Sequence, residues 1–287
     1  MKIIKYLIEF VLIGSLFIIF KLIGLKNASN LGAFLGKFIG PTLRSKKTII
    51  SNINKTGKNF TKYEIKLITK KMWSNYGRIL SEYMFIKKFR FSSLESNISV
   101  EGQEILEEIK KNDEPVLFIS GHFNNFELMA MHIEKSGINL AAIYRPLNNF
   151  YLNETMEKIR ERDICKKQIK KGRAGTRKII ENFRKGTSIA LMIDQRVREG
   201  DKIPFFDGLA TTTTIPAQLL KKYDCEIVPI YIERLKKNYF KMYVSKPIKV
   251  NKNKKIYEIT LFLNTILEKM ILKNVDQWIW THDRWKK

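Results

Sequence analysis

The chain of 287 residues contains little cysteine and little histidine. Its two cysteines, Cys165 and Cys225, lie far apart and form no Cys-x-x-Cys pair, and its histidines are His122, His132 and His282. These cysteines and histidines are too few and too widely spaced for a zinc cluster or a disulfide framework. We therefore predict no metal site and a reducing compartment. The sequence also lacks internal repeats and long linkers, and its length accommodates one large domain with an appendage.

Acidic residues are scarce as well. Lysine and arginine number 53 against 28 aspartates and glutamates, which gives a formal charge of +25. Such an excess favours a polyanionic partner: nucleic acid, an anionic membrane or an acidic protein. The basic residues are spread along the whole chain, and no recognisable nucleic-acid-binding signature accompanies them. We therefore predict no nucleic-acid partner, although a non-catalytic basic protein that binds membrane or nucleic acid remains an alternative.

Charge is absent from Phe10–Phe20, inside the apolar stretch Ile3–Ile23. The stretch has about the 20 residues that a membrane-spanning helix needs, with Lys5 and Glu9 as its interruptions. No small-x-small cleavage site follows, which argues against a signal peptide. The stretch fits both a helix that spans the membrane and a helix that lies in the membrane surface.

The residues after the apolar stretch are rich in positive charge, which favours a cytoplasmic location for the body of the protein. They are Lys21, Lys26, Lys37, Arg44, Lys46 and Lys47. A second apolar segment, Asn30–Pro41, is too short to span and suits an interfacial helix. We predict a membrane-anchor helix over residues 1–26, a helical membrane-proximal segment over 27–95 and a core over 96–287.

The core alternates between strand and helix patterns. Tyr63–Lys88 has the apolar spacing of a long amphipathic helix, either continuous or interrupted. The predicted strands are Ile98–Glu101, Val116–Ser120, Leu140–Tyr144, Ser188–Ile193, Glu226–Ile232 and Phe240–Val244. The predicted helices are Glu104–Lys111, Asn125–Lys135, Leu152–Asp163, Gly175–Lys185, Pro216–Tyr223 and Ile256–Lys273. This order predicts an α/β fold with a mixed, mostly parallel sheet flanked by helices.

The most informative motif is Gly-His-Phe-Asn-Asn-Phe-Glu at residues 121–127. It places His122 at the carboxyl end of a buried strand, where α/β sheets bind ligands, and Glu127 within the next helix. A carboxylate on one ring nitrogen would fix the tautomer and leave the other nitrogen able to take a proton from a hydroxyl. The alternative is a solvent-capped histidine beside an ordinary acidic first turn, with Asn125 as the helix cap.

Polar residues follow other predicted strands in the same way. Arg145 precedes a proline, which favours an extended conformation at a strand end, and Asp194, Gln195 and Arg196 follow Ser188–Ile193 directly. An ion pair with a neighbouring arginine is an equally plausible role for Asp194. Pro229 interrupts the last long strand and argues for an edge position, a bulge or a kink.

With these segments in register, the chain resembles the lysophospholipid-type acyltransferases, most closely the bacterial lipid A late acyltransferases. The matching blocks cover most of the chain in order. They are His-x4-Glu at His122 and Glu127, IYRPLNN at 143–149, GRAGTRKIIENFRKG at 172–186, MIDQ at 192–195, PFFDGLATTTT at 204–214, IVPIY at 227–231 and WIWTHDRWK at 278–286. Asn124 and Phe126 stand where members usually have Gly and Trp, and Asp207 interrupts the Phe-Phe-Gly.

The resemblance implies transfer of a fatty acyl group from acyl carrier protein to a hydroxyl of a lipid A precursor. It implies His122 as the general base, oriented by Glu127, and acceptor contacts by Arg145, Asp194, Gln195 and Arg196. It requires neither a metal nor a nucleotide cofactor, and it implies the inner membrane, with the catalytic domain in the cytoplasm. The rival within the same clan is an acyltransferase for a lysophospholipid or an amino-acid lipid.

Overall fold

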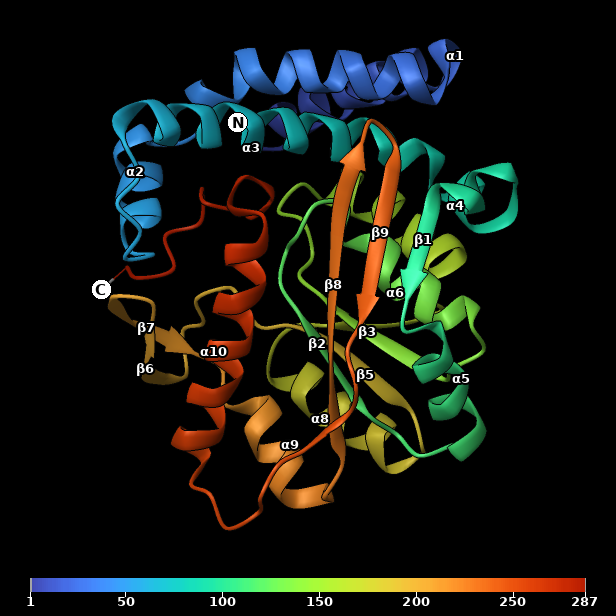
Figure 1. The fold of residues 1–287 in the computed structure, drawn as a ribbon. Coiled ribbons are helices and arrows are strands. Elements are labelled where there is room, and N and C mark those ends of the chain that lie inside the picture. Colours follow the sequence, from blue (N-terminus) through green and yellow to red (C-terminus); the bar gives the residue numbers. More distant parts are fainter. Residues whose placement is uncertain (1, 287) are drawn as a thin grey trace.

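A computed structural model describes residues 2–286 and contains an α/β core capped by helices (Figure 1). The main sheet has the strand order β1-β9-β8-β2-β5-β3-β4, and β10 pairs with β8 beside this path. The strands from β8 to β4 are mutually parallel, whereas β9 and β10 run antiparallel to β8. The predicted α/β class with a mixed, mostly parallel sheet is therefore confirmed.

The strands predicted from apolar runs all form, with shifts at their ends. The strands of the main sheet are β1 (Ile98–Glu101), β2 (Leu117–Ser120), β3 (Leu140–Tyr144), β4 (Lys167–Lys170), β5 (Ser188–Met192), β8 (Glu226–Lys236), β9 (Tyr239–Val244) and β10 (Ile248–Lys249). A separate hairpin consists of β6 (Asp201–Phe205) and β7 (Gly208–Thr212). The prediction missed β4, β10 and this hairpin.

Helices make the crossovers between the parallel strands. The crossover helices are α6 (Glu127–Lys135), α7 (Phe150–Ile159), α8 (Arg173–Arg184) and α9 (Ile215–Tyr223). Helix α5 (Gln103–Asn112) connects β1 to β2, which run in opposite directions, and α10 (Ile256–Lys273) follows the sheet. A π-helical turn over Arg160–Ile164 extends α7. The amino-terminal helices are α1 (Lys2–Leu43), α2 (Lys46–Asn54), α3 (Lys62–Glu82) and α4 (Ile86–Phe91), with 3-10 turns at Tyr83–Phe85 and Ser93–Asn97. The predicted interruption of Tyr63–Lys88 is thus the turn at Tyr83–Phe85.

Pro229 does not lie on an edge strand, because β8 is flanked by β2 on one side. On its other side β8 pairs with β10 up to Ile227 and with β9 from Ile230 onward. Pro229 stands between these two pairings, so its missing N–H costs no hydrogen bond of either ladder. Its carbonyl accepts from the backbone of Ser245. The edge interpretation was therefore wrong, and the change of neighbour explains the proline.

Helix α1 is divided at Gly24, whose φ of 76° and ψ of 163° are not helical. The second half packs against α3 through small residues that allow the backbones to touch. A Cβ on Gly77 would lie 1.8 Å from the carbonyl oxygen of Gly32, and one on Gly36 would lie 2.3 Å from that of Trp73. In Figure 1 this half runs along α3 at the end of the molecule toward which the arrowhead of β8 points. The carboxyl ends of the parallel strands therefore face the helical cap.

A buried ion pair connects that cap to the sheet. Glu82 at the end of α3 is fully buried and accepts two hydrogen bonds from Arg234 of β8, at 2.7 and 2.9 Å. The same carboxylate accepts from Ser29 of α1 and from Asn125. Asn125 is therefore a partner of Glu82 and does not cap α6, whose cap residue, Phe126, makes no side-chain cap hydrogen bond.

The segment after α10 packs into the protein. Trp278 and Trp280 are buried, and Trp285 stacks on Phe205 of the β6–β7 hairpin and donates to its carbonyl. Arg284 is fully buried and donates to Thr211 and Thr212 of β7. The tail therefore holds the β6–β7 hairpin, which follows β5 in the chain, against the rest of the protein.

Candidate active site

His122 follows β2 at the carboxyl edge of the sheet, as the sequence predicted. Its ring nitrogen Nδ1 lies 2.7 Å from Oδ1 of Asp194, which follows the neighbouring strand β5. The pairing is possible because two adjacent parallel strands end at the same level. The structure therefore brings together His122 and Asp194, which are 72 residues apart.

Asp194 is fully buried and well supplied with donors. Its Oδ2 accepts from the backbone N–H of His122 at 2.7 Å and from the indole N–H of Trp278 at 2.9 Å. Burial alone would raise the pKa of this carboxyl, but the charge and hydrogen bonds of His122, with the indole, lower it to about 2. Asp194 is therefore ionised and can only accept hydrogen bonds. The proton between the imidazole and the carboxylate consequently lies on Nδ1 of His122.

The opposite nitrogen of His122 is left as the basic one. Nε2 lies 3.4 Å from Nε2 of Gln195, and the ring packs edge-on against Phe126. Burial is the largest single influence and tends to lower the pKa of His122, yet the charge and the hydrogen bond of Asp194, with a smaller contribution from Glu127, together raise the pKa above the ordinary value. The arrangement provides a histidine with a fixed tautomer and increased basicity, which are the two properties that a general base requires.

Glu127 does not hold the ring of His122. Its Oε1 accepts from Nε and an Nη of Arg160 at 2.9 and 2.8 Å, and both side chains are largely buried. Among residues 2–286 no hydrogen bond joins Glu127 to His122, and its charge makes only a lesser contribution to the raised pKa of the histidine. The expected orienting contact by Glu127 is thus corrected: Asp194 makes it, and Glu127 anchors the first turn of α6 to the turn after α7.

The other predicted residues lie around this pair. Arg145 is exposed directly after β3, and Gln195 is near the free nitrogen of His122. The backbone N–H of Arg196 donates to Nε2 of His282, at 2.9 Å. We expected an ion pair with an arginine as the alternative role of Asp194. The structure instead pairs Asp194 with His122.

Sequence reasoning missed several residues of this site. Trp278 and Arg160 supply contacts that only the tertiary fold creates. Lys171, which follows β4, has a pKa lowered first by burial and then by the nearby charge of Arg145. A short strand that begins and ends with a lysine carries no apolar signal, so β4 and the position of Lys171 could not be recognised from the pattern.

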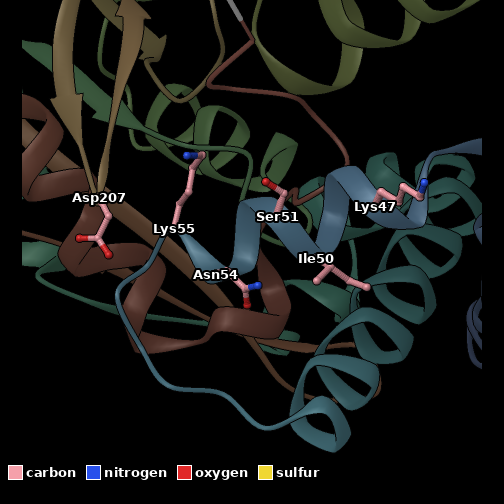
Figure 2. A pocket seen from close by; sticks show the side chains of 6 residues that line it. All are labelled: Lys47, Ile50, Ser51, Asn54, Lys55 and Asp207. Atoms are coloured by element: carbon pink, nitrogen blue, oxygen red, sulfur yellow. The ribbon is translucent and has the colours of Figure 1, made fainter.

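A separate surface hollow lies away from His122, between α2 and the turn of the β6–β7 hairpin (Figure 2). The side chains that line it are Lys47, Ile50, Ser51, Asn54, Lys55 and Asp207. It is open and contains none of the predicted site residues. Asp207, which interrupts the usual Phe-Phe-Gly pattern, therefore lines this hollow together with residues of α2.

The family model described as bacterial lipid A biosynthesis acyltransferase matches residues 1–287, which is the whole chain. The chain belongs to this family. It is therefore an acyltransferase of lipid A biosynthesis, and the resemblance found in the sequence blocks is confirmed. A comparison with individual curated proteins finds no match. Family membership excludes the alternative of a non-catalytic basic binding protein.

The substituted position Asn124 can now be explained in terms of the family pattern. Its φ is 47°, in the left-handed region where glycine, the usual residue of the family at this position, is unstrained. Asparagine tolerates this conformation better than most side chains, and the Asn124 amide bonds to Gln277 in compensation. The loop between His122 and Glu127 thus keeps the backbone shape that a glycine would adopt.

Proposed function

We propose that this acyltransferase moves a fatty acyl group from acyl carrier protein to a hydroxyl of a lipid A precursor, with His122 as the general base. The observation that carries the proposal is the pairing of Nδ1 of His122 with Asp194, which leaves Nε2, near the Gln195 amide, as the basic nitrogen at the edge of the sheet. The donor, the acceptor and the cytoplasmic face of the inner membrane agree with the family and with the basic residues after the apolar segment.

In the proposed reaction, Nε2 of His122 takes the proton of the acceptor hydroxyl while its oxygen attacks the thioester carbonyl carbon. A new ester C–O bond forms, and the C–S bond of the tetrahedral intermediate breaks. The imidazolium then gives its proton to the departing thiolate, so the histidine ends neutral. Asp194 stabilises the imidazolium in between and keeps the ring in place.

Cations at the carboxyl ends of β3 and β4 support binding of a phosphorylated acceptor. Arg145 is exposed, and its guanidinium can contact two phosphate oxygens at once. Lys171 lies within charge range of both Arg145 and Asp194. We assign these two residues to the acceptor phosphate, and Gln195, near Nε2 of His122, to the reacting hydroxyl or carbonyl. In this assignment Asp194 acts on the substrate only through His122. Arg196 helps to form the edge of the site beside Gln195.

Glu127 is assigned a positioning role. Its ion pair with Arg160 fixes the start of α6, and the loop from His122 to Phe126 enters that helix directly. The edge-on contact between His122 and Phe126 depends on this entry. Loss of Glu127 is therefore expected to impair catalysis through the geometry of the loop.

The test is an acyl-transfer assay with purified full-length protein, acyl carrier protein thioester and lipid A precursor. His122→Ala should lower kcat at least about a thousandfold, because base and leaving-group acid are lost together. His132→Ala is the matched control: His132 lies on α6 and pairs with Gln103, so its kcat should change by less than about threefold.

Activity that survives His122→Ala would remove the assigned base. The acceptor is tested separately by offering lysophospholipid, amino-acid lipid and lipid A precursor to the same preparation and identifying the products by mass spectrometry. Acylation of a different lipid, with His122 still required, would overturn the acceptor and keep the mechanism.

A further inference from the structure

The first half of α1, Lys2–Ile23, has an outward apolar face that no described residue covers. The large apolar side chains on it are at least one-third exposed, and the stretch is apolar enough for a membrane segment, with a mean hydropathy of 2.3. They are Ile3, Ile4, Leu7, Ile8, Val11, Leu12, Ile18, Ile19, Leu22 and Ile23. We call them the outward face.

The opposite face of the same helix is attached to the protein at both ends. Near Gly24, Phe20 is fully buried and Phe17 nearly so. At the other end, the ring of Tyr6 meets Phe150 edge-on at 6.2 Å, and the amide of Asn149 donates to the carbonyl of Tyr6 at 2.9 Å. The helix is apolar all round because one side packs on the protein and the other faces away from it.

This double attachment conflicts with a helix that crosses a bilayer. From Tyr6 to Phe20 an α-helix rises about 21 Å, so a perpendicular helix would place Tyr6 far into the membrane. Tyr6, however, touches the start of α7, and Arg160 directly after α7 holds Glu127 of the candidate site. Helix α7 spans only about 15 Å, so the catalytic residues would be drawn into the hydrocarbon. Buried ionised groups without water are costly there.

We propose that the first half of α1 lies flat in one membrane leaflet, with the outward face toward the acyl chains, and does not span the bilayer. An anionic phospholipid surface is the occupant that the charges favour. Exposed lysines flank the face at positions 2, 5, 21 and 26 and can reach the phosphate level from a helix lying in the interface.

The second half of α1 and the start of α7 also expose large apolar side chains. Phe34, Phe38 and Ile39 are more than half exposed on α1 beyond Gly24. Phe150 is 52% exposed and Leu147 is 41% exposed, next to the arginine that follows β3. An acceptor lipid could therefore remain in the leaflet while its head group reaches Arg145.

Sidedness of the amino terminus tests this topology without using activity. In a Cys225→Ala background, in which buried Cys165 is protected, single cysteines replace Lys2, Lys26 or the exposed Lys178 of α8. A membrane-impermeant maleimide is applied to spheroplasts and to inverted membrane vesicles. The proposal expects all three cysteines to react from the same side. Labelling of position 2 from the side opposite to positions 26 and 178 would overturn it.

Binding to lipid vesicles tests whether an anionic phospholipid surface covers the outward face. Leu12→Asp changes a residue of the outward face, 65% exposed, and Leu209→Asp changes a residue of similar exposure, 57%, on the β6–β7 hairpin. With vesicles containing anionic lipid, Leu12→Asp should lower the partition coefficient about tenfold or more, and Leu209→Asp less than twofold. Equal effects would contradict the proposal.

A lipid-free sedimentation run distinguishes a protein partner. A wild-type dimer that Leu12→Asp dissociates would show that a second copy covers the face, and the proposal would fail. Circular dichroism confirms the fold of each variant. Neither readout depends on acyl transfer, so failure here leaves the proposed reaction untouched.

Discussion

At the scale of single residues, the site depends on how Asp194 is held. Three N–H groups, from the ring and backbone of His122 and from Trp278, converge on a carboxylate with no exposure to solvent. Because the burial cost is met by these donors, the charge persists and acts on the adjacent imidazole. The basicity of His122 is therefore controlled by a residue of another strand.

Asp194→Asn should separate the role of Asp194 from that of Glu127. His122 acts as a base only when neutral, so wild-type kcat/KM falls as pH drops through its raised pKa. Without the charge of Asp194, burial lowers the pKa of His122, and the acidic limb of the pH profile moves to lower pH. The plateau should fall about 10²- to 10⁴-fold because the tautomer is no longer fixed.

Glu127→Gln is the matched control for that measurement. The charge of Glu127 is a lesser cause of the raised pKa, so its removal should move the acidic limb in the same direction but less. A larger displacement in Glu127→Gln than in Asp194→Asn would restore Glu127 as the orienting carboxylate.

Sequence spacing identified His122 but not the partner of its ring. The five-residue interval to Glu127 favoured a local pair, whereas the actual partner depends on β2 and β5 being neighbours in the sheet. Asp194 itself was predicted as a site residue, because polar residues after buried strands meet at one edge. Its contact could not be predicted, since an interval of 72 residues contains no geometric information.

At the scale of elements, the ion pair between Glu127 and Arg160 joins α6 to the turn after α7. Both side chains are about nine-tenths buried. Arg160→Met should lower the free energy of unfolding by about 3 kcal/mol, because it leaves an unpaired buried carboxylate. Adding Glu127→Gln should recover part of this loss, which urea unfolding of the single and double variants would measure. Strictly additive losses would show that the pair contributes no coupling.

The contact between α1 and α3 is a second element-scale feature. Gly77→Ala places a methyl group against the backbone of Gly32, so the helices must separate, at a cost of about 2 kcal/mol or more. Gly14→Ala is the control, because a Cβ there meets nothing within 4 Å and should be neutral or slightly stabilising. Thermal unfolding in detergent compares the two. Equal melting temperatures would contradict the close packing.

Among the elements, strands with a continuous buried apolar run were predictable, and strands without such a run were not. In β4, which reads Lys-Gln-Ile-Lys, only Ile169 is buried, so no apolar run marks the strand. No strand was predicted over residues 201–212, yet this segment forms the two-stranded β6–β7 hairpin. The amino-terminal helix was predicted, but its bend at Gly24 was not. The bend depends on packing against α3 and α7, and the apolar content of a segment gives no information about such packing.

At the scale of the whole molecule, the charge of +25 favours electrostatic association with an acidic protein, which is what the proposed donor, acyl carrier protein, would be. Raising the salt concentration from 0.1 to 1 M shortens the Debye length from about 10 to about 3 Å. The KM for acyl carrier protein thioester should rise about tenfold or more, while kcat changes less than about twofold. An uncharged acyl thioester is the control substrate, and an equal increase in its KM would show that salt acts on the enzyme itself.

The central position of β8 also has a consequence for folding kinetics. Strands β2, β3, β4 and β5 come from one continuous part of the chain, whereas β8 joins β2 late in the sequence, with Ser120 and Ile230 bonded across 110 residues. Closing such a distant parallel pairing is slow. Until β8 arrives, β2 has an open edge that invites association between chains. Refolding at high concentration should therefore be limited by aggregation of this partly assembled sheet, before the helical cap can close over it.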